Sequence, residues 1–284
     1  MIVQSIILAR FLLIVGTFIT FLCNDTNVLF PDLSFTRFKP VWVLDHFNIF
    51  YLSGPEYITH TKILCTLLLG LALSTRYIFF TTCCHWYISY CFFRFAPLVE
   101  GGDQITLILS FFLIPLMFWY QKNDHIETHT FTHSIYFLMK LQVAVVYFVA
   151  GVGKFQVEEW INGTIYYYWF NSPLYGAPEI FRELLNPLLL DSIVIFCISW
   201  GTMLFEIFLS TSILWGERMG SKLVKILLCG LSFHFLILLF HGLVSFFFAM
   251  AGALVILLLP MNYKINLKQP YLFQYLYRKR HSNI

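Results

Sequence analysis

Long apolar tracts separated by short polar segments dominate this chain. A transmembrane helix needs about 20 apolar residues to cross a hydrocarbon core of about 30 Å. Four tracts suit a single crossing: Ile2–Cys23, Gln104–Tyr120, Ser134–Gly153 and Leu188–Ser210. The first has neither a basic start nor a clear cleavage site, so it is predicted to be a retained helix and not a signal peptide.

Two further tracts are too long for one crossing. Ile58–Phe95 would reach well past about 50 Å as a single helix, and Leu223–Leu259 raises the same problem. Arg76 lies in the middle of the first tract, and His241-Gly242 interrupts the second. Each tract is therefore predicted to form two spans joined by a turn. The fold class expected is all-α, a polytopic membrane bundle of about eight helices.

Composition supports a membrane protein and excludes several other classes. Hydrophobic residues make up 59% of the chain, charged residues 12%, and the mean hydropathy is +0.74. Soluble domains carry about twice that charge fraction. The net charge of +3 and the lack of a basic, aromatic-interleaved patch argue against nucleic-acid binding. The seven cysteines form no CxxC pair or Cys/His spacing, so no metal site is predicted.

The basic residues predict the orientation in the cell membrane. With eight spans and an inner N-terminus, ten basic residues fall inside and six outside, as the positive-inside rule favours. Both termini are then cytoplasmic, and the loops 24–57 and 154–187 face outward. The division expected is a transmembrane domain over 1–262 and a basic cytoplasmic tail over 263–284.

Ionisable residues at membrane depth supply the candidate catalytic groups. Lys154 ends the fifth predicted span, and Glu206 lies deep in the sixth. Such residues are costly in lipid and mark functional sites by default. A lysine in apolar surroundings can serve as a general base, but it can also snorkel to the headgroups. A tight pair with Glu158, Glu159 or Glu206 would instead make Lys154 structural.

The predicted topology gathers further polar and aromatic residues toward the outer side. The spacings of five and seven from Gln142 to Tyr147 to Lys154 predict, loosely, a shared helical face. Trp160 also suits an interfacial aromatic belt, and a lone histidine is more often structural than a ligand. The candidate substrate-binding residues are Asp103, Gln104, Gln142, Tyr147, Trp160 and His234.

Common catalytic motifs are absent from the sequence. There is no P-loop, no GxGxxG at a strand–helix junction, no HExxH and no GxSxG. The pattern therefore argues against a nucleotide-dependent enzyme, a zincin or a serine hydrolase of the usual kinds. A transporter bundle is the least favoured reading, because the paired broken helices of an inverted repeat are not evident.

Two groups of residues carry a family resemblance over most of residues 5–260. One resembles the vitamin K-dependent carboxylase-like transmembrane (HTTM) family: Gln142, Tyr147, Ala150, Gly151, Lys154, Trp160 and Gly163, with Leu69-Gly70 and Ser74-Thr75-Arg76. The other resembles its sporulation-delaying protein B branch: Ala9-Arg10-Phe11-Leu12, Asn24–Phe30, Gly101-Gly102-Asp103-Gln104-Ile105 and Leu113-Ile114-Pro115.

The two levels of resemblance imply different functions. The carboxylases use the lysine that matches Lys154 to deprotonate a reduced quinone, but the histidine they need near Gly101 is missing here. The sporulation-delaying branch matures a secreted peptide toxin, together with a small partner protein encoded nearby. We therefore expect a membrane component for maturation or export of an antimicrobial peptide, whose precursor is one partner. The alternative is a quinone-dependent enzyme that modifies a protein or peptide through Lys154.

Overall fold

The computed structural model describes residues 3–122, 130–173, 176–215 and 222–259, and every regular element within these ranges is helical. This confirms the all-α prediction for the described residues, while the predicted tail 263–284 lies outside them. The elements in order are α1 (Val3–Cys23), α2 (Thr26–Leu29), α3 (Asp32–Arg37), η1 (Val43–Phe47), α4 (Ile49–Ala72), α5 (Ile78–Phe95), α6 (Gly101–Lys122), α7 (Thr130–Gly153), η3 (Lys154–Gln156), α8 (Glu158–Ile161), α9 (Ile165–Phe170), α10 (Glu179–Leu189), α11 (Ser192–Trp215), α12 (Lys222–His241) and α13 (Val244–Leu258).

Within the described ranges, five helices are long and apolar enough to cross a membrane: α1, α6, α7 with η3, α11 and α12. The chain thus has the helices of a multi-pass membrane protein. Both predicted hairpin breaks are present, because α4 and α5 are separated around Arg76, and α12 and α13 meet at Gly242. Three helices, α4, α5 and the shorter α13, are not among those five, so the total of eight spans stays a prediction.

The segment 24–57 is more ordered than the predicted loop. It holds α2, α3, η1 and the start of α4, whose first turn is capped because the Asn48 side chain accepts hydrogen bonds from the backbone N–H groups of Phe50 and Tyr51. Pro55 lies inside α4 just after a kink at Gly54 (φ 65°). The kink at Gly54 lets the helix resume with Pro55 in its new first turn.

The sixth predicted span is displaced from Leu188–Ser210 to α11. Leu188 belongs to the short helix α10, and a new helix begins after Asp191. The Asp191 carboxylate accepts hydrogen bonds from the N–H groups of Ile193 and Val194, at 2.9 and 3.1 Å, which caps α11. The fourth span likewise begins earlier than Gln104, since α6 starts at Gly101.

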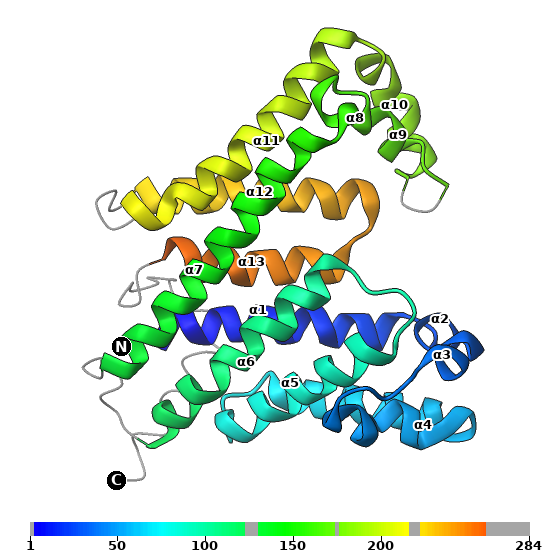
Figure 1. Cartoon of the computed structure of the whole chain (residues 1–284), viewed down its shortest axis with the longest axis vertical. Helices are drawn as coiled ribbons and strands as arrows, with labels where there is room; N and C mark the ends of the chain where they lie inside the picture. The colour runs from blue at the N-terminus through cyan, green and yellow to red at the C-terminus, as the bar shows by residue number, and fades with distance from the viewer. Residues whose placement is uncertain (1–2, 123–129, 174–175, 216–221, 260–284) are drawn as a thin grey trace.

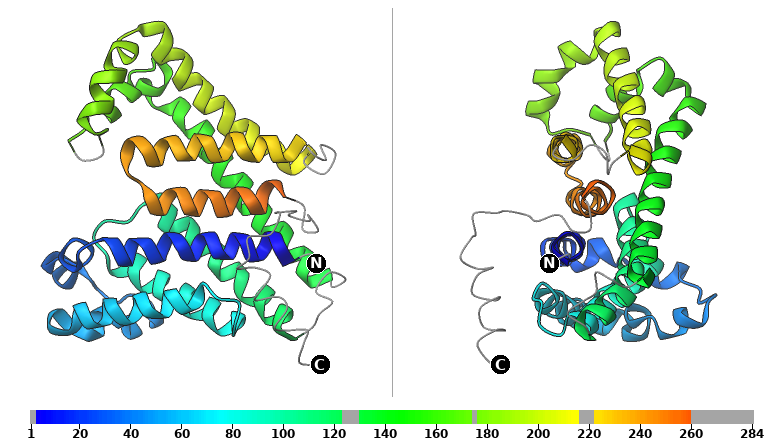
Figure 2. Two further views of the ribbon diagram at one scale, coloured as in Figure 1. Left: turned by 180° about the vertical axis from the view of Figure 1, so that it is seen from behind. Right: turned by 90° about the vertical axis from the view of Figure 1, so that its left-hand side faces the viewer.

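The long helices fall into two directions (Figures 1 and 2). The helices α1, α12 and α13 run alongside one another, while α7 and α11 cross them on the diagonal as a closely packed pair. The start of α1 and the end of α13 lie at one end of the bundle; α2 and α3 lie at the other end, and α8–α10 lie on that same side but well apart from them. The predicted loops 24–57 and 154–187 therefore lie on the same side.

A glycine permits the close approach of α7 and α11. A Cβ atom at Gly151 would lie 2.7 Å from Cγ1 of Ile207 and 3.1 Å from the carbonyl oxygen of Met203. Only a residue without a side chain fits this separation. The contact sets the distance between the two helices directly beneath Lys154 and one residue from Glu206 along α11.

Buried polar side chains also join α1 to α5. Arg10 is 1% exposed, and its guanidinium donates to the hydroxyl oxygens of Thr82 (2.6 Å) and Thr81 (2.7 Å). One turn further along α5, the two ring nitrogens of His85 lie 3.0 Å from the Thr17 hydroxyl and 3.2 Å from the Ser110 hydroxyl. Polar side chains inside a membrane protein need such hydrogen-bond partners within the protein, because the hydrocarbon core offers none.

A buried carboxylate holds the η1 segment in place. The Asp45 side chain accepts hydrogen bonds from the N–H groups of Val41 and Trp42, from the Tyr90 hydroxyl and from the Arg94 guanidinium. The Arg94 guanidinium holds the pKa of Asp45 well below its usual range, so the carboxylate stays ionised and the ion pair intact through the physiological range.

Topology can be tested with single cysteines in a cysteine-free background. Val43 is 78% exposed at the end that holds the two long loops, and Thr75 is exposed in the turn between α4 and α5. An impermeant maleimide applied to intact cells should label Val43→Cys and not Thr75→Cys. Labelling of Thr75→Cys alone would reverse the orientation, and labelling of both would contradict a membrane hairpin of α4 and α5.

The close α7–α11 contact predicts that Gly151→Val destabilises the protein. Overpacking a tight site costs about 1–3 kcal/mol, so the Tm of the purified protein should fall in thermal unfolding. Gly153→Ala is the matched control, because a Cβ atom at Gly153 meets nothing within 4 Å and alanine is the better helix former. An equal Tm for both variants would show that Gly151 does not set the helix spacing.

Candidate functional site

Lys154 lies where α7 ends and its chain turns toward the cap formed by α8–α10. The α-helix ends at Gly153, and Lys154 opens the short 3₁₀ turn η3. Its ammonium reaches back along the helix and donates to the carbonyl oxygen of Ala150 at 3.1 Å. A cation at the C-terminal end of a helix is favoured by the helix dipole.

The structure pairs the two predicted catalytic residues. Nζ of Lys154 lies 2.5 Å from Oε2 of Glu206 on α11, and the two side chains are only 16% and 10% exposed. The ammonium also lies 4.9 Å from the ring centroid of Trp160 on α8, a cation–π contact. A carboxylate, a carbonyl and an aromatic face therefore surround one ammonium, and each buried charge neutralises the other.

Trp160 and Gly163 attach the cap to α11. The Ser199 hydroxyl donates to the backbone carbonyl of Trp160 at 2.5 Å, and the Trp200 indole N–H donates to that of Ile161 at 2.9 Å. At Gly163 (φ +88°) a Cβ atom would lie 2.8 Å from the backbone nitrogen of Phe196. Trp160 and Gly163, three residues apart in the sequence, thus both contact α11.

The sequence analysis did not predict a second contact at the site, the pair formed by Tyr166 and Thr202. The Tyr166 hydroxyl on α9 lies 2.5 Å from the hydroxyl of Thr202, which stands four residues before Glu206 on α11. A signal was available, because residues four apart share a helix face and Thr202 and Glu206 are both polar in an apolar tract. The pair ties the cap to α11 one turn from the carboxylate.

Tyr147 and His234 form a second polar pair on the inner side of α7. The Tyr147 hydroxyl lies 2.7 Å from Nε2 of His234 on α12, and both residues are almost fully buried. Nδ1 of His234 has no hydrogen-bond partner among the described residues. Buried polar atoms are nearly always partnered, so this nitrogen is a place where a water or a ligand group would be stabilised.

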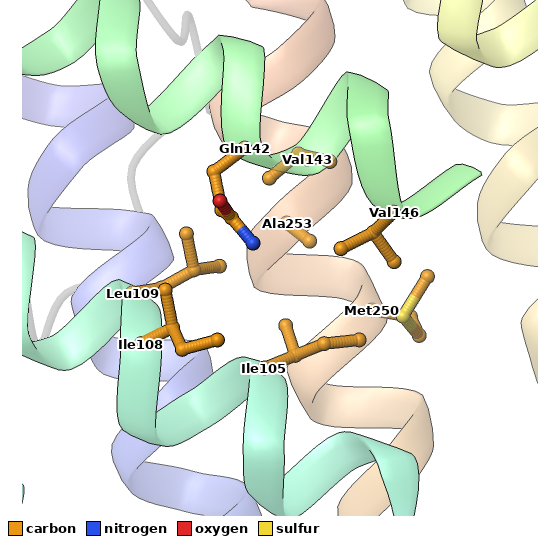
Figure 3. A pocket seen from close by; sticks show the side chains of 8 residues that line it. All are labelled: Ile105, Ile108, Leu109, Gln142, Val143, Val146, Met250 and Ala253. Carbon is orange, nitrogen blue, oxygen red and sulfur yellow. The ribbon is translucent and has the colours of Figure 1, made fainter. Parts of the chain in front are cut away.

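Gln142 does not share a face with Tyr147 and Lys154, so this part of the predicted alignment is wrong. Its amide points into a small pocket between α6, α7 and α13, as Figure 3 shows. Five residues turn a helix by about 500°, so Gln142 and Tyr147 lie about 140° apart. The other lining residues are all apolar: Ile105, Ile108, Leu109, Val143, Val146, Met250 and Ala253.

Asp103 and Gln104 belong to a different part of the molecule. The Asp103 carboxylate accepts a hydrogen bond from the backbone N–H of Glu100 at 2.9 Å, in the first turn of α6. The Glu100 carboxylate accepts one from the Ser245 hydroxyl at the start of α13. The side chain of Gln104 is exposed. Within the described residues, neither the Asp103 nor the Gln104 side chain is hydrogen-bonded to Lys154 or Glu206. The ionic centre and the polar start of α6 are therefore two separate features.

The described residues contain no group of three or more His, Cys, Asp or Glu side chains arranged to hold a metal ion. The groups that meet at the centre are the Lys154 ammonium, the Glu206 carboxylate and the Trp160 ring. An ammonium and a carboxylate beneath an aromatic cap can hold a polar group of a substrate, or keep the cap in place over α11.

Comparison with known proteins places the chain among bacterial relatives. It is 33% identical to the sporulation-delaying protein SdpB of Bacillus subtilis (strain 168), over 97% of this chain and 88% of that protein. It is also 27% identical to the uncharacterized protein YitO of the same organism, over 97% of this chain and 91% of that protein.

Two other comparisons give no match. No known family pattern matches the chain, and no solved structure is similar to it. The alignment with SdpB nevertheless covers 97% of this chain. A relation of this identity over nearly the whole length of both proteins shows common descent: the chain belongs to the family of the sporulation-delaying protein SdpB.

Proposed function

We propose that this chain is an integral membrane component required for the maturation or export of a secreted antimicrobial peptide. The observation that carries the proposal is the 33% identity to SdpB over 97% of the chain. In this function the precursor of the peptide is the substrate, and a small protein encoded nearby is the partner. The end of the bundle that holds α2, α3 and α8–α10 faces outward and receives the precursor.

The geometry supports a structural role for the ion pair in that function. Lys154 and Glu206 join the end of α7 to α11, and Trp160 extends the contact to α8. A buried charge left without its partner costs about 3–5 kcal/mol. The pair therefore holds the cap against the bundle at the end where the precursor is proposed to bind.

The alternative function is that of a quinone-dependent enzyme that modifies a peptide through Lys154. It requires that the amine lose its proton and reach a substrate. In the structure the ammonium is engaged by Glu206, Ala150 and the Trp160 ring. An engagement of this kind favours the structural role, and a reduced quinone remains the cofactor to test only if Lys154 proves to carry chemistry.

Deletion of the gene tests the proposed function. Secreted peptides are compared by mass spectrometry in the parent strain, the deletion strain and the complemented strain. We expect one mature peptide to disappear on deletion and to return on complementation, while its precursor accumulates in the membrane. An unchanged set of secreted peptides would contradict the proposal.

Substitutions at Lys154 separate the structural from the catalytic role. Lys154→Arg keeps the charge and the pairing with Glu206, but guanidinium does not serve as a base. We therefore expect this variant to produce mature peptide at the parental level. Lys154→Met leaves the Glu206 carboxylate unpaired and should lower both the amount of folded protein and the yield of peptide, measured by blotting and mass spectrometry.

The double variant Lys154→Met/Glu206→Gln is the matched control. It removes both charges, so the cost of an unpaired buried carboxylate disappears. A structural pair predicts that folded protein and peptide recover together. Recovery of the folded protein without the peptide, or a well-folded and inactive Lys154→Arg variant, would assign chemistry to Lys154.

Asp103 provides a separate test of the outer surface. The proposal predicts that Asp103→Ala remains in the membrane while unprocessed precursor accumulates, because the carboxylate contacts the peptide. Asp103→Asn is the control, since its amide oxygen can still accept the hydrogen bond from Glu100 N–H. Normal processing by Asp103→Asn together with a defect in Asp103→Ala would limit Asp103 to capping α6.

A further inference from the structure

The helix α10 has a polar side and a wide apolar side. With 100° per residue, Glu179, Glu183 and Asn186 share one side of the helix, and Arg182 stands at its border. The opposite half consists of aliphatic and aromatic residues: Ile180, Phe181, Leu184, Leu185, Leu188 and Leu189. A helix with this division of side chains lies between an apolar and an aqueous phase.

Only half of that apolar side packs within the molecule. Phe181, Leu185 and Leu189 join a small cluster with Phe170, and the Phe181 ring lies 5.4 Å from that of Phe240 on α12. The other half forms a stripe of exposed side chains, because Ile180, Leu184 and Leu188 are 72%, 70% and 52% exposed. The packing therefore fixes α10 in place and leaves this stripe uncovered.

The direction of α10 suits an interface. Figures 1 and 2 show it at the end of the bundle, running across the direction of α1, α12 and α13. A helix that lies across the spans at their ends meets the boundary between headgroups and acyl chains. The neighbouring helix α9 exposes Tyr168 (60%) and Trp169 (41%), which are residue types enriched at that depth.

The exposed apolar surface continues along the chain into a membrane-spanning helix. After Leu190, α11 begins at Ser192; it exposes Ile193 (73%) in its first turn, and Leu204 and Phe208 further along. The exposed side chains of a spanning helix face lipid. The stripe on α10 thus leads directly into the lipid-facing side of α11.

We propose that α10 is an interfacial helix, whose partner is the lipid surface at this end of the bundle. Ile180, Leu184 and Leu188 enter the acyl boundary, and Glu179 and Glu183 remain in water. Two kinds of contact then hold the cap. Lipid contacts α10, and the Trp160 carbonyl and the Tyr166 hydroxyl are hydrogen-bonded to side chains of α11. The proposal is independent of the peptide that the protein matures.

Spin labelling of the full-length protein tests this arrangement. Single cysteines at Ile180, Glu183, Leu184 and Leu188 are placed in a cysteine-free background and reconstituted in nanodiscs of phosphatidylglycerol and phosphatidylethanolamine. Molecular oxygen concentrates in lipid, whereas a nickel chelate stays in water. The oxygen-to-nickel collision ratio should be several-fold higher at the three apolar positions than at Glu183, the matched control.

Two results would overturn the proposal. Ready collision with the nickel chelate at all four positions would place α10 in water. Low collision with both reagents at the three apolar positions would show that protein covers the stripe, either a second copy or a partner.

A second measurement needs no substitution. The native-sequence protein is reconstituted with a lipid that carries a photoreactive group on its acyl chain, and adducts are mapped by mass spectrometry. Adducts should form on Ile180, Leu184 or Leu188 as well as on the exposed side of α11. Adducts on α11 with none on α10 would contradict the proposal.

Discussion

A polar group in hydrocarbon must find its partner within the protein, and this constraint explains the interior of the bundle. Lys154 meets Glu206, Arg10 meets two threonine hydroxyls, and Tyr147 meets His234. Every one of these contacts joins two different helices. Because the surrounding side chains are apolar and interchangeable, the polar pairs determine which helices are neighbours and in which register they pack.

Close backbone contacts and polar pairs act together at α11. Gly151 brings α7 close to α11 beside Glu206, and Gly163 brings the cap against the same helix near Phe196. The same helix carries Thr202 for Tyr166 and Ser199 for the Trp160 carbonyl. One face of α11 thus positions the whole candidate centre, and a change in its register would separate Lys154 from Glu206.

Hydropathy predicted the long helices and both hairpin breaks because the length of an apolar run and the position of Arg76 or Gly242 are local properties. It did not predict α8, α9 and α10, whose few residues become helical through packing on α11 and α12. Lys154 and Glu206 were recognised from the cost of burying charge, and Glu206 was one of three carboxylates considered as a partner for Lys154. Their pairing, and the separation of Gln142 and Asp103 from them, depend on helix rotations that sequence spacing describes only loosely.

The hydroxyl partners of Arg10 affect how the protein inserts into the membrane during its synthesis. Arg10 lies in α1, but Thr81 and Thr82 follow some seventy residues later in the chain. A lone arginine at the centre of a helix opposes partition from the translocon into lipid by roughly 2.5–3.5 kcal/mol. The nascent α1 therefore gains its full compatibility with the bilayer only when α5 has been synthesised, which couples insertion of α1 to its assembly with α5.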